Sequence, residues 1–254
     1  AVLEYTERFD GRRPEALVLS RDAWLEQARA LDPEIRRALT EAGDRIRRYH
    51  EHQRESGFRY EEGGIELGQR VLPVSAAAVY ATGGKARYPS TVLMTAIPAT
   101  VAGVGRIVLV TPNPTPEILA GAEVAGVTEV VDAGGAQAIA AVSYGTESIA
   151  RVDKVVGTGN IYVACAKRLV FGVVDIDSIA GPSEALVVAD DGADPQIVAA
   201  DLLTQAEHDE AAYPLLVTIS RAQADAVDQA LAQQLDALPR KAIASEAIRK
   251  NGYC

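Results

Sequence analysis

Short apolar runs and alanine-rich stretches alternate along most of the chain, beginning near Gln69. The runs are rich in β-branched residues, and several show no polar alternation, which is typical of strands buried on both faces. We expect strands at residues 71–79, 107–110, 129–131, 154–156, 185–188 and 215–219. The stretches between the runs predict helices at residues 93–104, 116–125, 136–144, 161–170, 195–207 and 222–238.

The regular alternation of strand and helix indicates the fold class. At this spacing it predicts right-handed crossovers and a mainly parallel sheet with helices on both faces, which is an α/β fold. We expect residues 69–182 to form a first α/β domain. Residues 183–254 are expected to begin a second α/β domain that is incomplete.

The first 68 residues follow a different pattern. Asp32-Pro33 is typical of a helix start, with aspartate at the cap and proline in the first turn. Apolar residues then recur at steps of four and three, which predicts a single apolar stripe on this helix: Ile35, Leu39, Ala42, Ile46 and Tyr49. Gly63-Gly64 and Gly68 indicate a loop before the next element. Residues 1–68 are therefore predicted to be a helical N-terminal segment.

Composition and charge narrow the class of protein. The chain has 254 residues, 48% of them hydrophobic and 24% charged, as in an ordinary globular protein. A formal charge of −10 argues against a nucleic-acid partner, and no apolar run reaches the roughly 18 residues of a membrane span. Two cysteines are too few for a disulfide framework, so we expect a cytoplasmic location and a buried thiol at Cys165.

Glycines cluster where predicted strands end. In an open parallel sheet these carboxyl ends form the ligand crevice, and glycines there let backbone amides approach a phosphate. No Gly-x-Gly-x-x-Gly sequence is present, so spacing alone leaves two interpretations open, a dinucleotide site and tight structural turns. The clusters are Gly83-Gly84, Gly134-Gly135, Gly157-Thr158-Gly159-Asn160 and Gly181-Pro182.

Gln205 and His208 are the most informative polar pair. They are three residues apart, so on a helix they project from one face and are placed to hold one ion or substrate. Zinc needs at least three protein ligands, and glutamine is a poor one. The other histidines, His50 and His52, lie far upstream. From the residues alone, the pair is either half of a metal site or a polar helix end.

Taken together, eight collinear motifs resemble the histidinol dehydrogenase family, in the order in which the family has them. The resemblance runs from about Gly68 to Pro214 and is weaker in the flanks. The motifs occupy residues 80–85, 88–94, 97–103, 134–140, 152–157, 166–168, 180–184 and 205–208.

The resemblance implies a fold, a reaction and a set of site residues. It implies Rossmann-like α/β domains and an NAD-dependent, zinc-containing enzyme that oxidises L-histidinol through the aldehyde to L-histidine. Ser183 matches a substrate-contacting serine, while Gln205 and His208 match positions that both ligate zinc and face the substrate. The positions that match cofactor contacts are Tyr80, Gln137 and Asn160.

The resemblance also implies partners and missing parts. The family forms homodimers and supplies a catalytic Glu-His pair, together with an aspartate and a histidine for zinc, beyond the segment matched here. No histidine follows His208 in this sequence. We therefore expect a fragment that has no catalytic residues of its own and produces no NADH from L-histidinol. Two alternatives stay open: a related dehydrogenase of another small polar alcohol, and a non-catalytic remnant that binds cofactor or assists assembly.

Overall fold

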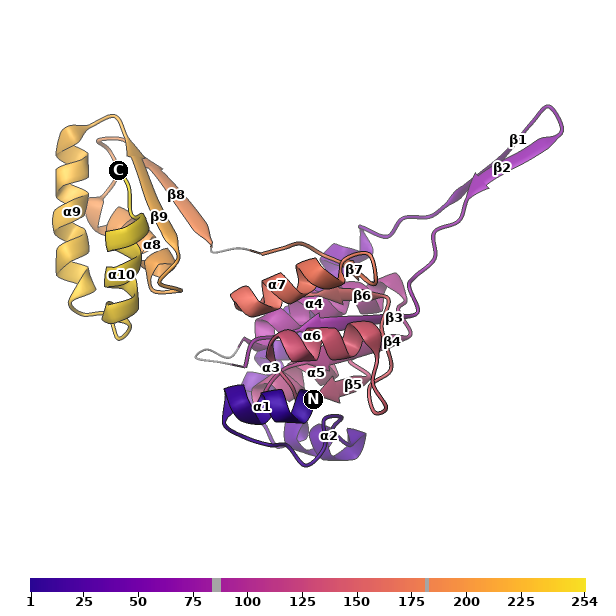
Figure 1. Ribbon diagram of the computed structural model, residues 1–254. Coiled ribbons are helices and arrows are strands. Elements are labelled where there is room, and N and C mark those ends of the chain that lie inside the picture. Colours follow the sequence, from indigo (N-terminus) through magenta and orange to yellow (C-terminus); the bar gives the residue numbers. More distant parts are fainter. Residues whose placement is uncertain (84–87, 181–182) are drawn as a thin grey trace. The chain divides into compact units, whose positions relative to one another are not determined.

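The computed structural model describes residues 1–83, 88–180 and 183–254. The chain divides into two compact units, Ala1–Ile179 and Ala180–Cys254 (Figure 1). Each unit combines parallel strands with covering helices, so the predicted α/β fold class is confirmed. Within the described residues, no helix combines the length and apolar character needed to cross a membrane.

A five-stranded parallel sheet forms the centre of the first unit, with the order β5-β4-β3-β6-β7. The chain enters at the middle strand, adds two strands on one side and then crosses to the other side. The direction of winding therefore reverses between β3 and β6, and ligands bind at such a point in open α/β sheets. The strands are β3 (Ala76–Tyr80), β4 (Arg106–Val110), β5 (Glu129–Val131), β6 (Lys154–Val156) and β7 (Asp175–Ile176).

Helices cover both faces of this sheet (Figure 1). Alternate strand residues point to opposite faces, so Val79 and Leu109 face one core while Tyr80 and Val110 face the other. The first core lies under α4 (Pro89–Ala102) and α5 (Pro116–Ala125). The second lies under α6 (Gly135–Tyr144) and α7 (Ile161–Val170). Burial on both faces explains why the strands lack polar alternation.

Three N-terminal helices precede the sheet: α1 (Val2–Asp10), α2 (Arg21–Arg29) and α3 (Pro33–Glu51). Helices α2 and α3 contribute to the first core, whereas Val2 of α1 packs against the second. Asp32 caps α3 by accepting hydrogen bonds from the backbone N–H groups of Glu34 and Ile35. The predicted stripe is only partly buried. Leu39, Ala42 and Ile46 contact the core, whereas Ile35 and Tyr49 are exposed because they lie near the two ends of the helix, beyond that contact.

A β-hairpin occupies the segment that was predicted to be a loop. Strands β1 (Phe58–Glu62) and β2 (Ile65–Gln69) pair antiparallel, with Glu62 opposite Ile65. Gly63 and Gly64 have φ angles of +60° and +77°, which is the conformation that a two-residue hairpin turn requires. The loop prediction was therefore wrong, because the paired glycines mark a tight turn. The strand predicted at residues 71–79 is also shorter, since β3 begins at Ala76.

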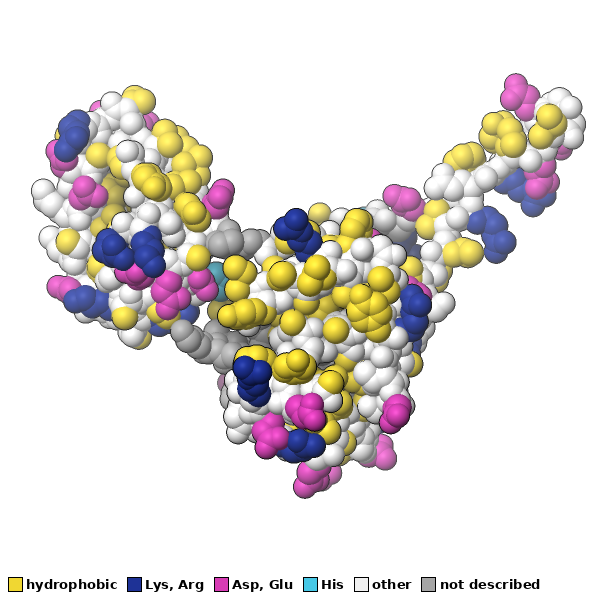
Figure 2. Space-filling model, viewed as in Figure 1, with side chains coloured by type: hydrophobic (Ala, Val, Ile, Leu, Met, Phe, Trp, Pro, Cys, Tyr) yellow, Lys and Arg dark blue, Asp and Glu magenta, His cyan; other side chains and the backbone are white. Residues whose placement is uncertain are grey.

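Cys165 is exposed, which corrects the prediction of a buried thiol. The buried side chains of α7 recur at helical spacing toward the sheet, and Cys165 lies on the opposite side: the buried positions are Val163, Ala166, Lys167 and Val170. Ile161, Tyr162 and Leu169 are also exposed on α7, and Figure 2 shows apolar side chains gathered over this region. An apolar sequence pattern alone did not reveal which side of the helix is covered.

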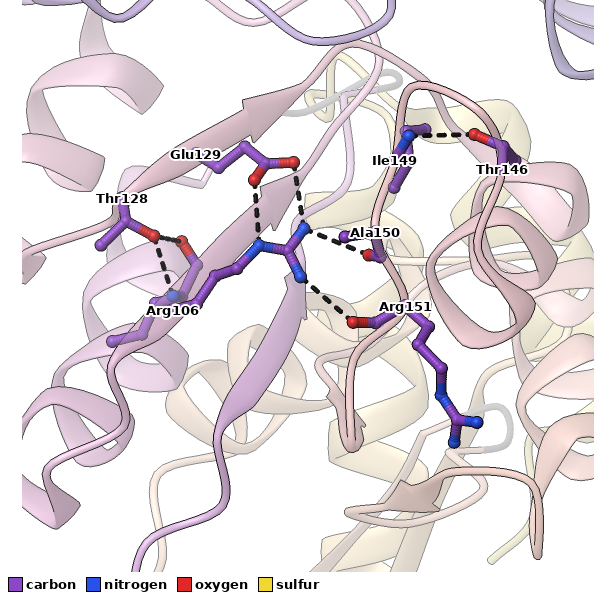
Figure 3. Close-up of polar contacts among 8 residues, drawn as sticks. Arg106, Thr128, Glu129, Thr146, Ile149, Ala150 and Arg151 are labelled. Atoms are coloured by element: carbon purple, nitrogen blue, oxygen red, sulfur yellow. Dashed lines mark hydrogen bonds and ion pairs between the residues drawn. The ribbon is translucent and has the colours of Figure 1, made fainter.

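The amino ends of β4 and β5 are fixed by one arginine (Figure 3). Nε of Arg106 donates to Glu129 at 3.0 Å, and its Nη2 donates to the other carboxylate oxygen at 3.2 Å. The same guanidinium donates to the carbonyl oxygens of Ala150 and Arg151 at 3.1 and 3.2 Å. One side chain therefore connects two strands and the loop before β6. This contact lies at the amino ends of the strands, whereas the glycine-rich loops lie at their carboxyl ends.

The second unit contains two parallel strands and three helices. Strand β8 (Glu184–Ala189) pairs in register with β9 (Tyr213–Thr218), and α8 (Pro195–Ala206) connects them. Helices α9 (Arg221–Leu235) and α10 (Lys241–Asn251) follow, and the sequence did not predict the latter. Leu202 and Val227 lie in the core that these elements share.

We expect Trp24→Ala to lower the free energy of unfolding by about 3–5 kcal/mol, because the indole is 1% exposed in the core shared by α2 and the sheet. Urea unfolding followed by circular dichroism measures this loss. Tyr49→Ala removes an exposed ring from the same N-terminal segment and should change stability by no more than about 0.5 kcal/mol. Equal stability of the two variants would contradict the packing role of α2.

Candidate functional site

The carboxyl ends of β3 and β6 meet at the point where the winding of the first sheet reverses. Tyr80 is the last residue of β3, and Gly157 follows β6 directly. A methyl group on Gly157 would overlap the carbonyl oxygen of Tyr80, and its φ of +106° is one that other residues rarely adopt. Glycine at this position therefore lets the loop after β6 lie against the end of β3.

The Tyr80 side chain links this point to α6. It is 4% exposed, and its hydroxyl oxygen accepts a hydrogen bond from the backbone N–H of Gly135 at 3.1 Å. Burial raises the pKa of the Tyr80 phenol, the bond from Gly135 opposes this, and the nearby Asp10 carboxylate adds to the increase. A raised pKa keeps the phenol protonated at neutral pH, so its own proton remains available for donation.

Gln137 lies in the first turn of α6, beside the same glycine. A methyl group on Gly135 would lie 2.8 Å from Oε1 of Gln137, so the glutamine side chain folds back over the start of its helix. Gly134 is the N-cap and offers no side chain to the first N–H groups of α6. At the amino end of this helix, with its positive dipole, the N–H of Gly135 binds Tyr80, and the N-cap residue itself supplies no acceptor.

Asn160 begins α7 and caps it. Its Oδ1 accepts hydrogen bonds from the backbone N–H groups of Tyr162 and Val163, both at 3.1 Å. The residue is exposed, and no described residue accepts a hydrogen bond from its Nδ2. The structure thus places Tyr80, Gln137 and Asn160 on one edge of the sheet. Gly84 and Lys85, which belong to the motif that follows Tyr80, lie outside the described residues.

An ion pair between a buried lysine and an exposed aspartate, Lys167 and Asp177, holds the loop between β6 and α7. Lys167 is 1% exposed; its Nζ donates to the carbonyl oxygen of Gly157 at 2.8 Å and pairs with the Asp177 carboxylate. Oδ2 of Asp177 accepts from the Gly157 N–H at 2.8 Å. Burial raises the pKa of Asp177, but the hydrogen bonds from Lys167, Gly157 and Ser178 outweigh it, so the pKa lies below its usual value.

A second polar cluster lies at the carboxyl ends of β4 and β5. Asp132 follows β5, and its Oδ1 accepts from the backbone N–H of Asn113 at 2.7 Å. Both oxygens of this carboxylate accept from the guanidinium of Arg12, one of them at 2.7 Å. The N-terminal segment therefore helps to hold the loop after β4. Sequence analysis did not identify this pair, because its partners are 120 residues apart.

The other candidate residues lie in the second unit, at the amino edge of its sheet. Ser183 directly precedes β8, and its carbonyl oxygen accepts from the N–H of Tyr213 at 3.1 Å. Helix α8 runs back to this edge and ends at Ala206, two residues before His208. The neighbouring residues Gly181 and Pro182 lie outside the described residues.

Gln205 and His208 keep the spacing that the sequence indicated. The N–H of His208 donates to the carbonyl oxygen of Gln205 at 3.1 Å, so the chain continues past α8 as a 3₁₀-type turn. Side chains three residues apart overlie each other in such a turn. Nε2 of Gln205 is buried and has no hydrogen-bond partner among the described residues, whereas His208 is exposed.

The metal-binding capacity of these groups is limited. In the part of the chain that the structure describes, no three His, Cys, Asp or Glu side chains are grouped closely enough to hold a metal ion. A histidine nitrogen and a glutamine oxygen are donors that zinc accepts, yet a stable zinc site takes at least three protein ligands. Gln205 and His208 therefore fit two positions of a zinc shell.

Comparisons with known proteins give one consistent result. The profile of the histidinol dehydrogenase family matches residues 1–254. Histidinol dehydrogenases from Aquifex aeolicus and Rhodospirillum rubrum are 52% and 51% identical to this chain over 99% of its residues. The crystal structure of histidinol dehydrogenase from Elizabethkingia anophelis superposes with a TM-score of 0.89 at 37% identity, and the match covers 99% of this chain.

The matches cover only part of each relative. The chain spans about 60% of the length of the two curated relatives and 60% of the chain in the crystal structure. The matched span includes both units. The chain therefore belongs to the histidinol dehydrogenase family.

Proposed function

We propose that the protein containing this chain is a zinc-requiring, NAD-dependent dehydrogenase that oxidises L-histidinol through L-histidinal to L-histidine. Family membership supports an oxidoreductase of histidine biosynthesis. The observation that supports NAD binding is that Tyr80, Gly135 and Gln137 lie together beside the loop that ends at Asn160. This convergence lies where open α/β sheets bind nucleotides.

The described residues fit a dinucleotide at this edge. The N-cap residue of α6, Gly134, has no side chain to bind the N–H groups that follow Gly135, and such a helix terminus suits a phosphate group. The Tyr80 phenol is protonated and fixed by Gly135, so it can donate to a polar atom of the cofactor. Asn160 uses its oxygen for the helix cap and keeps its amide nitrogen for donation. Bound NAD would accept the hydride that the alcohol loses.

The second unit supplies the proposed substrate contacts. Ser183, Gln205 and His208 lie at one edge of its sheet and offer a hydroxyl, an amide and an imidazole. A zinc ion held in part by Gln205 and His208 would orient the amino alcohol through its nitrogen atoms. These two residues account for two ligand positions, and the serine hydroxyl would hold the substrate by hydrogen bonding.

The remaining attributes are also proposals for the whole protein, because the chain spans about 60% of its relatives. We propose a homodimer without nucleic-acid or membrane partners, with L-histidinol as the small-molecule substrate. A cytoplasmic location agrees with two cysteines that are both free. The absence of turnover in the 254-residue chain by itself stays a prediction.

Asn160→Ser tests the cofactor contact. Serine also caps helices, so the melting temperature should stay close to that of the unaltered chain, while NAD binding weakens about three- to tenfold through loss of one hydrogen bond. Calorimetric titration with NAD measures the affinity, and a thermal scan measures the cap. Unchanged affinity in Asn160→Ser would contradict the assignment, as would an absence of NAD binding by the unaltered chain.

His208→Ala tests the zinc and substrate assignment in the whole protein. Loss of a direct ligand should reduce zinc affinity by at least about 100-fold, the upper end for loss of an outer-shell partner, and NADH formation from L-histidinol should fall with it. Glu210→Gln, an exposed change two residues away, is the matched control and should leave both quantities unchanged. Full zinc content and activity in the His208 variant would rule out this role.

A further inference from the structure

We propose that Lys167 and Asp177 are positioning residues that hold the loop from Gly157 to Asn160 in the shape that binds the cofactor. The inference rests on the proposed NAD site, since Asn160 is one of its contacts. Neither side chain reaches that site directly, because both end on the backbone of Gly157. Their effect on the cofactor would therefore be transmitted through the loop.

Gly157 is buried, and both of its backbone polar groups bind these two side chains. Its N–H donates to Asp177 and its carbonyl oxygen accepts from Lys167, each at 2.8 Å. The two bonds fix the peptide planes on either side of Gly157. An amide and a carbonyl that lose their partners in a buried position carry a large desolvation cost, so the loop would move to regain partners if the pair were removed.

The loop is also fixed at its other end. Asn160 caps α7 through Tyr162 and Val163, and Lys167 extends from the same helix back to Gly157. Only Thr158 and Gly159 lie between the two fixed residues. Asp177 comes from the chain segment directly after β7, so the neighbouring strand sets where the pair lies. Loop, helix and sheet are thereby held together at the start of α7.

Stability alone does not account for charges at these positions. Even a fully buried ion pair is often no more stabilising than well-packed apolar side chains of similar volume, and the Asp177 end of this pair is exposed. Apolar side chains, however, cannot bind the N–H and carbonyl groups of Gly157. The distinctive property of the Lys167–Asp177 pair is therefore the conformation that it imposes on the backbone of this loop.

The same two strands provide a matched control. Lys154 begins β6 and Asp175 begins β7, and they form a second lysine–aspartate pair at the opposite ends of these strands. Lys154 also donates to a backbone carbonyl oxygen, that of Ile176, at 3.3 Å. Lys154→Met removes an ion pair of the same kind, from the same strands, at the edge away from the proposed cofactor loop.

The experiment compares four chains with the unaltered one: Lys167→Met, Asp177→Leu, the double variant with both changes, and Lys154→Met. NAD affinity is measured by calorimetry, stability by thermal unfolding, and loop order by amide hydrogen exchange of residues 157–160 without NAD. We expect each single change in the pair to weaken NAD binding about tenfold or more and to speed exchange in the loop. Lys154→Met should leave NAD affinity and loop exchange unchanged.

The double variant separates positioning from stability. Asp177→Leu leaves the buried Lys167 ammonium without its partner, whereas removing both charges leaves no unpaired buried ion, so the melting temperature of the double variant should recover relative to Asp177→Leu. Its NAD affinity should remain weak, because Gly157 still lacks both partners. Affinity within about twofold of the unaltered chain in Lys167→Met, or recovery of affinity together with stability in the double variant, would overturn the inference alone. No NAD binding by the unaltered chain would overturn the proposed function and the inference with it.

Discussion

The close approach of Gly157 to the carbonyl group of Tyr80 is the constraint on which the candidate cofactor edge depends. It brings the loop after β6 against the end of β3, where the order of the sheet reverses. Tyr80 then reaches Gly135 with its hydroxyl group and so connects this point to α6. A larger residue in place of Gly157 would separate the two strand ends and displace the start of α7. The cofactor edge therefore depends on backbone packing before it depends on any polar side chain.

Much of the fold could be predicted because local signals and burial agree. The bounds of α5, α7, β5 and β6 match those expected from the sequence, and glycine, proline or a capping residue marks at least one end of α5, α7 and β6. The prediction failed where tertiary packing determines which side of a helix is buried. Cys165 has the same apolar neighbours as a core residue, yet it lies on the outer side of α7. Gly63-Gly64 predicts a loop, but the structure forms the β1–β2 hairpin there, because both glycines adopt positive φ angles in a tight turn.

The candidate site was predictable only in part, for a related reason. Motif order identified Tyr80, Gln137 and Asn160, and the sheet topology explains why they share an edge. Sequence order did not reveal how this edge is held. Lys167 lies within the motif at residues 166–168, but that motif does not indicate a buried lysine, and Asp177 lies outside the eight motifs. The two residues pair ten positions apart, across a loop and a strand. Their importance follows from burial and from the backbone groups that they bind.

The two edges of the first sheet use polar side chains in different ways. At the amino edge, Arg106 binds Glu129 and two carbonyl oxygens, so the contacts of this guanidinium lie within the protein. At the carboxyl edge, Lys167 and Asp177 bind the backbone of one glycine, while the first turn of α6 keeps N–H groups without a capping side chain. A rigid backbone beside N–H groups that have no partner within the protein lets a site bind a ligand without reorganising. The polar side chains at the amino ends of the strands therefore stabilise the fold, whereas those at the carboxyl ends hold the backbone in a shape that leaves N–H groups available to a ligand.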